Sequence, residues 1–402
     1  MERKSFFDTA ERYIIKKPIR LIELFAGIGA QAKALERIGV DFEHYKVCEI
    51  DKHSIKSYNA IHSTDFITSD ISKLHGSDLE ITNTDKYDYI LTYSFPCTDL
   101  SSAGQQLGMS ENSQTRSSLL WQVGRILTEC RERELPQILL MENVVQVHSK
   151  ENICDFNRWL DILKNLGYKN YLNDVSALSC GIPQTRTRSF MISILGNYSY
   201  NFPELQTAPN NCLDFLDKNV DYSYYITNDF GKYLVSKLIN SQKFRSLISH
   251  KSDDQCSIGC YIKNYNFCDI VNSKNTWMSN IKKDSSIKSD DVTKQRIVLK
   301  PNNICGTLTT FKKDNIVVEI YGIEKFDHSS PLKDFSVSIN NKEYVVLIRY
   351  LTVEECFRLM GFDDVDSEKV ISIGTSKERI YSQTGNSIVV NVLQKIFEQL
   401  IR

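Results

Sequence analysis

The stretch "SFPCTDLS", residues 94–101, places a cysteine directly after a proline and just beyond the apolar run "YDYILTY". A thiol in this position could be a packed core group, a metal ligand or a nucleophile. A thiolate is a strong nucleophile, and nearby positive charge or a helix terminus favours its formation. The proline at position 96 fixes φ and so shapes the turn that would present Cys97.

Further charged groups follow other apolar runs. Glu142 and Asn143 come after "ILLM", and the motif "QTRTR" carries Arg186 and Arg188, which share one face if the segment is extended. Each group alone has an ordinary explanation, since a single cysteine is usually packed in a core and charged residues usually lie at a surface. Their occurrence together at the predicted ends of strands indicates an active site with Cys97 as nucleophile.

A second set of residues predicts a cofactor site. In "LFAGIGA", Gly27 and Gly29 would let the backbone turn tightly and approach a ligand, although such a pair is as often a structural turn. Glu49, 20 residues after Gly29, is placed to bind ribose hydroxyls, and Asp70 could accept from an adenine amino group. Position 32 is Ala where a dinucleotide motif has its third glycine, so a nucleoside without a pyrophosphate, such as S-adenosylmethionine, fits better than NAD.

These groups need a scaffold that brings their loops together. The sequence pattern of residues 1–195 predicts such a scaffold. Short apolar runs predict strands, and amphipathic stretches predict helices. The strands are expected at 19–25, 44–51, 66–72, 86–93, 137–144 and 189–195, and the helices at 30–39, 54–62, 118–132 and 153–167. This alternation predicts an α/β fold with a doubly wound, mostly parallel sheet, whose ligands bind at the carboxyl ends of the strands. Cys97 would then follow the fourth strand and Glu142 the fifth.

The chain changes character after residue 195. Residues 196–345 are rich in polar residues without the strand–helix alternation, and Lys232–Lys313 holds 15 Lys or Arg against 6 Asp or Glu, a net charge of +9. Such a segment indicates phosphate binding, or else a solvated polar insertion.

Regular structure returns at the end of the chain. Thr352 and Glu355 predict a helix that begins with a capping box, and apolar pairs from 388/389 to 400/401 predict a final helix that packs on the first domain. We therefore expect a catalytic domain made of residues 1–195 and 346–402, with residues 196–345 inserted as a second domain.

Composition narrows the function classes. The 402-residue chain is 41% hydrophobic and 25% charged, with a net charge of −1, no signal-peptide core and no run near the roughly 18 apolar residues of a membrane span. We expect a cytoplasmic protein without a membrane partner. Its eleven cysteines are expected to be reduced, and the spacing of Cys256, Cys260 and Cys268, with His250 upstream, is not a zinc-ribbon pattern, so no metal is expected.

With these motifs the sequence resembles the DNA (cytosine-5)-methyltransferase family of the bacterial and phage modification type. The stretches that match, in the family's order, are "LFAGIG" (24–29), "EID" (49–51), "SDI" (69–71), "SFPCTDLS" (94–101), "MENV" (141–144), "QTRTR" (184–188), "RYLTVEECFRLMGF" (349–362) and "QTGNSIVV" (383–390). The loop at 108–121 is similar to the subgroup that includes the CpG methylases of mollicutes. Thr98 departs from the pattern, since many relatives carry Gln there.

The resemblance implies a class I, Rossmann-like methyltransferase domain and a smaller, irregular target-recognition domain at 196–345. Cys97 would attack C6 of the cytosine, Glu142 would bind N3 and the exocyclic amine, Arg188 would contact O2, and Arg186 would support it. Segment 98–118 would be a mobile lid. The residues expected to hold S-adenosylmethionine, which would leave as S-adenosylhomocysteine, are Phe25, Gly27, Ile28, Gly29, Glu49, Ile50, Asp70, Ile71, Pro96, Asn386 and Ser387.

The resemblance also implies the partners. The substrate would be a short specific site in double-stranded DNA, with its cytosine flipped out of the duplex. The enzyme would be a monomer, and a cognate restriction endonuclease could act on the same site.

Other reactions remain open alternatives. A tRNA cytosine-5 methyltransferase would share the chemistry, although the large basic insertion favours duplex DNA. An inactive DNA-binding relative would not need Cys97, Glu142 and both arginines. An amino-methyltransferase would need a second proline and an aromatic residue that "SFPC" lacks, and a cysteine hydrolase would need a base such as His148 and would leave the glycine turn unexplained.

Overall fold

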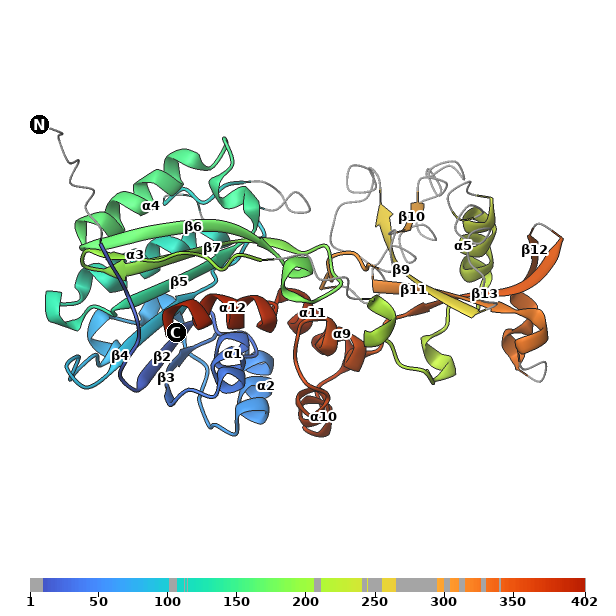
Figure 1. Cartoon of the computed structure of the whole chain (residues 1–402), viewed down its shortest axis with the longest axis horizontal. Coiled ribbons are helices and arrows are strands. Elements are labelled where there is room, and N and C mark those ends of the chain that lie inside the picture. The colour runs from blue at the N-terminus through green and yellow to red at the C-terminus, as the bar shows by residue number, and fades with distance from the viewer. Residues whose placement is uncertain are drawn as a thin grey trace, which may run out of the picture. The chain divides into compact units, whose positions relative to one another are not determined.

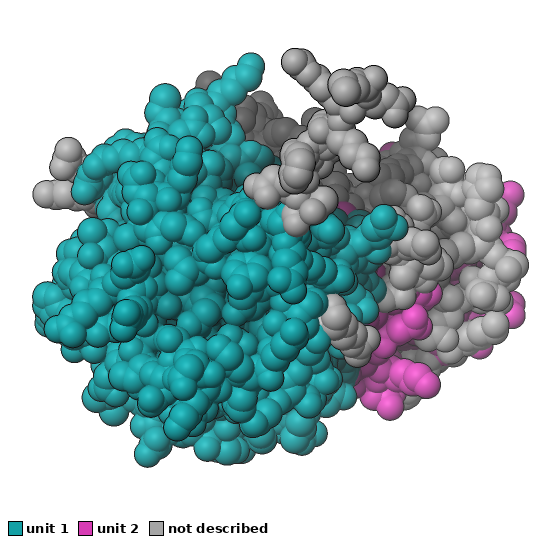
Figure 2. Space-filling view, turned by 60° about the vertical axis from the view of Figure 1, so that its left-hand side comes forward, with its two compact units in different colours: residues 1–182, 186–208, 357–402 teal, residues 183–185, 209–356 magenta. Residues whose placement is uncertain are grey.

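The computed structural model describes residues 10–100, 107–111, 113, 115–205, 211–240, 244, 255–264, 295–299, 304–310, 315–326, 330–339 and 341–401. The chain divides into two compact units, which Figure 2 colours separately. Unit 1 consists of residues 1–182, 186–208 and 357–402, and unit 2 of residues 183–185 and 209–356. Parts of the expected lid (101–106, 112 and 114), together with His250 and Cys268, lie outside the described residues.

Unit 1 is built on a six-stranded sheet of order β3-β2-β4-β5-β7-β6 (Figure 1). Its strands are β2 (Ile19–Leu24), β3 (Phe42–Cys48), β4 (Asp88–Tyr93), β5 (Ile138–Asn143), β6 (Tyr168–Ser176) and β7 (Thr187–Leu195). The first four in this order pair in parallel, whereas β7 is antiparallel to both β5 and β6. Every residue of β4 and β5 is buried, as expected of central strands covered on both faces. The predicted mostly parallel α/β fold is confirmed.

Helices cover both faces of this sheet. The helices of unit 1 are α1 (Ala30–Ile38), α2 (Lys52–His62), α3 (Leu120–Glu129), α4 (Ile153–Asn165), α10 (Asp364–Ser372), α11 (Lys377–Asn386) and α12 (Val390–Ile401), of which α10 packs on α2. Helices α3 and α4 share a core with the strand residues Leu91, Tyr93 and Met141. Helices α1 and α12 pack together on the other face (Figure 1). A short parallel pair, β1 (Glu11–Arg12) and β8 (Tyr198–Ser199), lies outside the main sheet.

One predicted strand of unit 1 is absent, and one observed strand was not predicted. Residues 66–72 form no strand, because Asp70 accepts hydrogen bonds from the backbone and side chain of Ser72 and starts a 3₁₀ turn, Ile71–Lys73. Cys97 therefore follows the third strand of the sheet rather than the fourth. Strand β6 was not predicted, because it is an edge strand in which only Tyr168 and Val175 are buried, so it lacks a regular apolar pattern.

The end of the chain completes unit 1. The apolar pairs at 392/393 and 396/397 are buried on α12, as are Val390 and Leu400. Tyr200 donates to the Ile396 carbonyl, and the Ile15 amide donates to the Leu400 carbonyl. The final helix therefore belongs to the same core as the first strands of the chain. No helix among the described residues is long and apolar enough to cross a membrane.

Unit 2 holds a five-stranded antiparallel sheet of order β10-β9-β11-β13-β12. Its elements are β9 (Gln255–Asn264), β10 (Gln295–Leu299), β11 (Asn315–Gly322), β12 (Ser336–Ile339), β13 (Lys342–Tyr350) and α5 (Asp229–Ile239), and α9 (Val353–Leu359) begins in it. Its core joins Leu234 and Leu238 of α5 to Val318 and Ile348 of the sheet.

A buried ion network closes unit 2 at the start of α9. Arg349 donates to both oxygens of Glu355 at 2.8 Å and to Glu319 at 2.5 Å. The Thr352 hydroxyl accepts from the Glu355 amide at 3.1 Å, and the Glu355 carboxylate accepts from the Thr352 amide at 2.8 Å. The predicted capping box is confirmed, and it also orients the carboxylate that satisfies Arg349.

The turn between β2 and α1 depends on glycine. Gly29 has φ +81°, and a Cβ atom there would lie 2.2 Å from Nε2 of His62 and 2.7 Å from the Tyr58 ring. Gly39, at the other end of α1, has φ +74°, but a Cβ atom there would meet nothing within 4 Å. Both positions are unfavourable for a residue with a side chain, but Gly29 is also sterically closed.

The pair Gly29→Ala and Gly39→Ala separates these two effects. Gly39→Ala should cost about 1–2 kcal/mol of unfolding free energy through backbone strain alone. Gly29→Ala should cost roughly 1–3 kcal/mol more, because His62 must move. Urea and thermal unfolding of the full chain measure both, and equal losses would contradict a steric role for His62.

Candidate active site

The Cys97 loop begins where β4 ends and is fixed by hydrogen bonds from two neighbouring segments. Asn143 Nδ2, at the end of β5, donates to the Phe95 carbonyl at 2.9 Å. The Ser117 hydroxyl donates to the Pro96 carbonyl at 2.7 Å. The thiol of Cys97 is half-buried at the carboxyl edge of the sheet. Neither Asn143 nor Ser117 was predicted as a site residue, and only the "EN" pair gave a signal for Asn143.

Glu142 and Arg188 meet on one face of the sheet. Glu142 lies opposite Phe190 in the antiparallel β5–β7 pair, and Arg188 lies two residues before Phe190 on the same face. The Arg188 Nε atom is 3.4 Å from Glu142 Oε1. This contact requires β7 to run antiparallel, since only then does its first residue reach the carboxyl edge where β5 ends.

Arg186 binds the C-terminal part of unit 1. Its guanidinium is buried and donates to the carbonyls of Gly385, at 3.2 Å, and Ser387, at 2.7 Å. The structure thus brings the motifs "QTRTR" and "QTGNSIVV" together. Ser387 is buried there, whereas the Asn386 side chain is exposed.

Glu142, Arg186 and Arg188 have opposing effects on the pKa of the Cys97 thiol. Burial raises the pKa of Cys97, the Glu142 charge raises it further, and Arg188 and Arg186 lower it. Burial also raises the pKa of Glu142, against the same two arginines. The thiol is therefore held mainly protonated, close to groups whose charges can shift that balance.

Glu49 connects three loops in which cofactor residues were predicted. Its carboxylate accepts from the Gly27 amide at 2.9 Å and from the Asp51 amide at 2.8 Å. Its carbonyl accepts from the Ser69 amide at 2.9 Å. Burial raises the Glu49 pKa, and the Asp51 and Gly27 amides oppose the shift. Through its carboxylate and its backbone carbonyl, Glu49 thus links the three segments in which cofactor residues were predicted.

A groove of about 580 Å³ lies next to Glu49. It is lined by Ile50, Thr68, Ser69, Asp70, Lys73, Leu74 and Asp78. Ile50 is 69% exposed, and Asp70 is a half-buried residue whose carboxylate has a pKa lowered by hydrogen bonds from Ser72. An apolar surface beside carboxylate acceptors fits a nucleoside, and the space at Gly27 is open for 4 Å around a Cβ position.

The predicted cofactor residues divide by exposure. Ile50 and Asp70 line the groove, whereas Ile28 and Ile71 are buried and shape the loops from within. Phe25 and Pro96 are half-buried. Thr68, Ser69, Lys73, Leu74 and Asp78 were not predicted, although their closeness to Asp70 in the sequence was a usable signal.

Comparison with known proteins agrees with this geometry. The profile of the C-5 cytosine-specific DNA methylase family matches residues 19–402. The type II methyltransferase M2.ScrFI of Lactococcus lactis subsp. cremoris is 28% identical over 96% of this chain and 99% of its own. The orphan methyltransferase M.SssI of Spiroplasma monobiae is 28% identical over 96% and 97%, which confirms the expected mollicute similarity.

Two solved structures share the fold. The S. pombe Dnmt2 methyltransferase has a TM-score of 0.57 and 19% identity, covering 95% of this chain and 97% of its own. A putative DNA modification methyltransferase from an E. coli prophage has a TM-score of 0.54 and 18% identity, with coverages of 95% and 98%.

The charge balance at Cys97 predicts opposite effects of two substitutions. At a fixed pH near 8, Glu142→Gln should speed alkylation of Cys97 by iodoacetamide, because removing a negative charge lowers the thiol pKa. Arg188→Gln should slow it, because removing a positive charge raises that pKa. A shift of one unit corresponds to about tenfold in thiolate fraction.

Mass spectrometry of the Cys97 peptide measures both rates, with the exposed Cys154 as an internal reference. In the unmodified protein the Cys97 rate should still be rising at the pH where an ordinary thiol approaches its limit. Shifts of the same sign in the two variants would contradict the assigned charges.

Proposed function

Because the chain belongs to the C-5 cytosine-specific DNA methylase family and is a DNA (cytosine-5)-methyltransferase, we propose that it transfers a methyl group from S-adenosylmethionine to C5 of a flipped-out cytosine in duplex DNA. The observation that carries the mechanism is the convergence of Cys97, Glu142 and Arg188 at one edge of the sheet. The proposed nucleophile is Cys97.

The reaction needs a nucleophile because C5 of cytosine is too electron-poor to accept a methyl group directly. The Cys97 thiolate adds to C6, and the electrons of the C5–C6 double bond make C5 an enamine-like carbon. Bound S-adenosylmethionine supplies an electrophilic methyl group, which C5 takes. A base then removes the C5 proton, the double bond re-forms, and the Cys97 thiolate leaves C6.

Glu142 has two linked tasks in this scheme. Its raised pKa suits it to hold a proton for N3 of the base, which draws electrons toward N3 as the thiolate adds. A hydrogen bond from the base also reduces the negative charge that opposes Cys97 ionisation. Binding of the target base would therefore favour ionisation of Cys97 at the point when that base is in place.

The arginines supply the positive charge. Arg188 would contact O2 of the base, and its position 3.4 Å from Glu142 and its lowering of the Cys97 pKa support this role. Arg186 is proposed as a positioning residue, because both of its terminal nitrogens donate to the carbonyls of Gly385 and Ser387.

The cofactor would bind in unit 1 at Glu49 and the groove beside it. Glu49 would accept from ribose hydroxyls with the lone pairs that its backbone contacts leave, and Asp70 would accept from the adenine amine. Ile50 would cover one face of the heterocycle. Gly27 keeps the loop open on the ligand side, and Pro96, Asn386 and Ser387 are assigned to the same ligand.

Unit 2 is proposed to recognise the DNA. Its basic segment, Lys232–Lys313, would neutralise phosphates, although most of that segment lies outside the described residues. A flipped cytosine would be needed, since Cys97 cannot reach C6 within a stacked duplex. We further propose that the enzyme acts as a monomer at a short specific site, which a cognate restriction endonuclease could share.

Cys97→Ser should lower methyl transfer to duplex DNA by more than about 10³-fold, because a hydroxyl is a far weaker nucleophile than a thiolate. Cys154→Ser, an exposed cysteine on α4, should leave the rate unchanged. Transfer of labelled methyl groups measures both, with tRNA as the alternative substrate, and bisulfite sequencing of host DNA gives the target site.

Trapping separates the covalent step from the transfer. DNA that carries 5-fluorocytosine should form a denaturation-resistant complex with the unmodified enzyme and none with Cys97→Ser, since fluorine cannot leave as the C5 proton does. A trapped complex with the serine variant, or methylation of tRNA in preference to DNA, would overturn the corresponding part of the proposal.

Ile50→Ala should weaken S-adenosylmethionine binding by roughly 10-fold, because it removes about 1–2 kcal/mol of apolar contact. Ile67→Ala is the matched control, since Ile67 is 82% exposed but does not line the groove. Calorimetric titration measures the affinities, and unfolding without ligand should be unchanged in both. Equal effects in the two variants would place the adenine elsewhere.

A further inference from the structure

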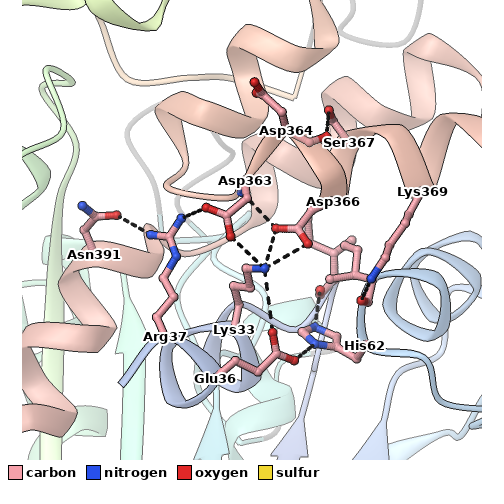
Figure 3. A network of polar contacts seen from close by, with 12 residues as sticks. Lys33, Glu36, Arg37, His62, Asp363, Asp364, Asp366, Ser367, Lys369 and Asn391 are labelled. Atoms are coloured by element: carbon pink, nitrogen blue, oxygen red, sulfur yellow. Dashed lines mark hydrogen bonds and ion pairs between the residues drawn. The ribbon is translucent and has the colours of Figure 1, made fainter. Parts of the chain in front are cut away.

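Glu36, His44 and His62 form a cluster in unit 1 that the proposed reaction does not use. They come from α1, β3 and the last residue of α2. One ligand atom from each lies within 4.8 Å of the other two. His62 Nδ1 is 2.6 Å from Glu36 Oε1, and His44 Nε2 is 3.9 Å from the same oxygen. Figure 3 shows His62 and Glu36 facing each other within a wider polar network.

The other nitrogen of each imidazole already contacts an oxygen. His62 Nε2 is 3.3 Å from the Ile28 carbonyl, which can only accept, so that nitrogen carries a hydrogen. His44 Nδ1 is 2.8 Å from the Tyr58 hydroxyl, which itself donates to Glu23. The Tyr58 oxygen therefore accepts from His44. These contacts leave His62 Nδ1 and His44 Nε2 as the two ring nitrogens that face Glu36. In the metal-free chain a hydrogen bridges His62 Nδ1 and Glu36 Oε1, which are 2.6 Å apart, and a bound ion would take the place of that hydrogen.

We propose that Glu36, His44 and His62 bind a divalent transition-metal ion, with Zn²⁺ the best match to two imidazoles and one carboxylate. Metal-binding histidines commonly donate their second ring nitrogen to a carbonyl or to a carboxylate-linked partner, as both do in this cluster. Zn²⁺–ligand bonds of ~2.0–2.1 Å at tetrahedral angles place the ligand atoms about 3.3 Å from one another. Small rotations of the three side chains would bring their ligand atoms to this separation. Water would take the fourth position.

The neighbouring charges leave Glu36 available. Lys33 is 3.8 Å from Glu36 Oε2, but its ammonium lies 2.9 Å from both Asp363 and Asp366. Arg37 pairs with Asp363 as well. The Glu36 oxygen nearest the histidines, Oε1, is therefore not the one that Lys33 approaches.

The site would have a structural role. His62 lies directly under Gly29 and contacts the Ile28 carbonyl, so an ion on His62 would hold the loop at 27–29 from behind. It would also tie α1, β3 and α2 together. This inference does not depend on the proposed methyl transfer.

The test is titration of the metal-free full chain with Zn²⁺, followed by calorimetry, and with Co²⁺, followed by visible absorption. We expect one saturable site per chain, a tetrahedral Co²⁺ spectrum without thiolate charge-transfer bands, and a thermal midpoint raised by several degrees with Zn²⁺. Mg²⁺ should neither bind at this site nor raise the thermal midpoint. The absence of thiolate bands separates this site from binding by the eleven cysteines.

His44→Asn and Glu36→Gln should each weaken Zn²⁺ binding at least tenfold. The His44 side chain is 18% exposed and that of Glu36 33%, and circular dichroism checks that both variants fold. His75→Asn is the matched control, since His75 forms an exposed pair with Glu129 at 3.2 Å. The proposal would be overturned by any of three results: no saturable Zn²⁺ binding, thiolate bands in the Co²⁺ spectrum, or affinities unchanged in His44→Asn and Glu36→Gln. The cluster would then hold only a His62–Glu36 hydrogen bond.

Discussion

The direction of the strands in unit 1 is the constraint on which the rest of the site depends. Strands β3, β2, β4 and β5 run in parallel and end at one edge of the sheet. Strand β7 runs the other way, so it begins at that edge. The loop of Cys97, the end of β5 and the start of β7 are therefore close in space although they are far apart in the sequence. A parallel β7 would place Arg188 at the opposite edge, away from Glu142.

Charge at this edge is balanced rather than simply positive. Two arginines favour the Cys97 thiolate, while burial and Glu142 oppose it. A thiol held in this way is less exposed to unwanted reactions, and a ligand that neutralises Glu142 shifts the balance toward the thiolate. In the proposed mechanism, the same carboxylate would connect recognition of the base to the ionisation of Cys97.

The C-terminal segment contributes structure to this edge as well as to the core. Arg186 binds the carbonyls of Gly385 and Ser387, and α12 packs on α1 directly after the glycine turn. Behind that turn, His62 contacts Ile28 and closes the space at Gly29. The loop proposed to face the cofactor is therefore supported from its inner side by His62.

Local sequence predicted much of this. Apolar runs located β2, β4 and β5, the Thr352 capping box located the start of α9, and motif order identified the family, because periodicity, caps and short motifs act over a few residues. Tertiary structure alone decided the direction of β7, the loss of a strand at 66–72 and the contact of Arg186 with Ser387. It also decided which predicted residues line the groove, and that Glu36, His44 and His62 meet. Strand direction and side-chain convergence depend on pairing between distant segments, and no local pattern encodes that pairing.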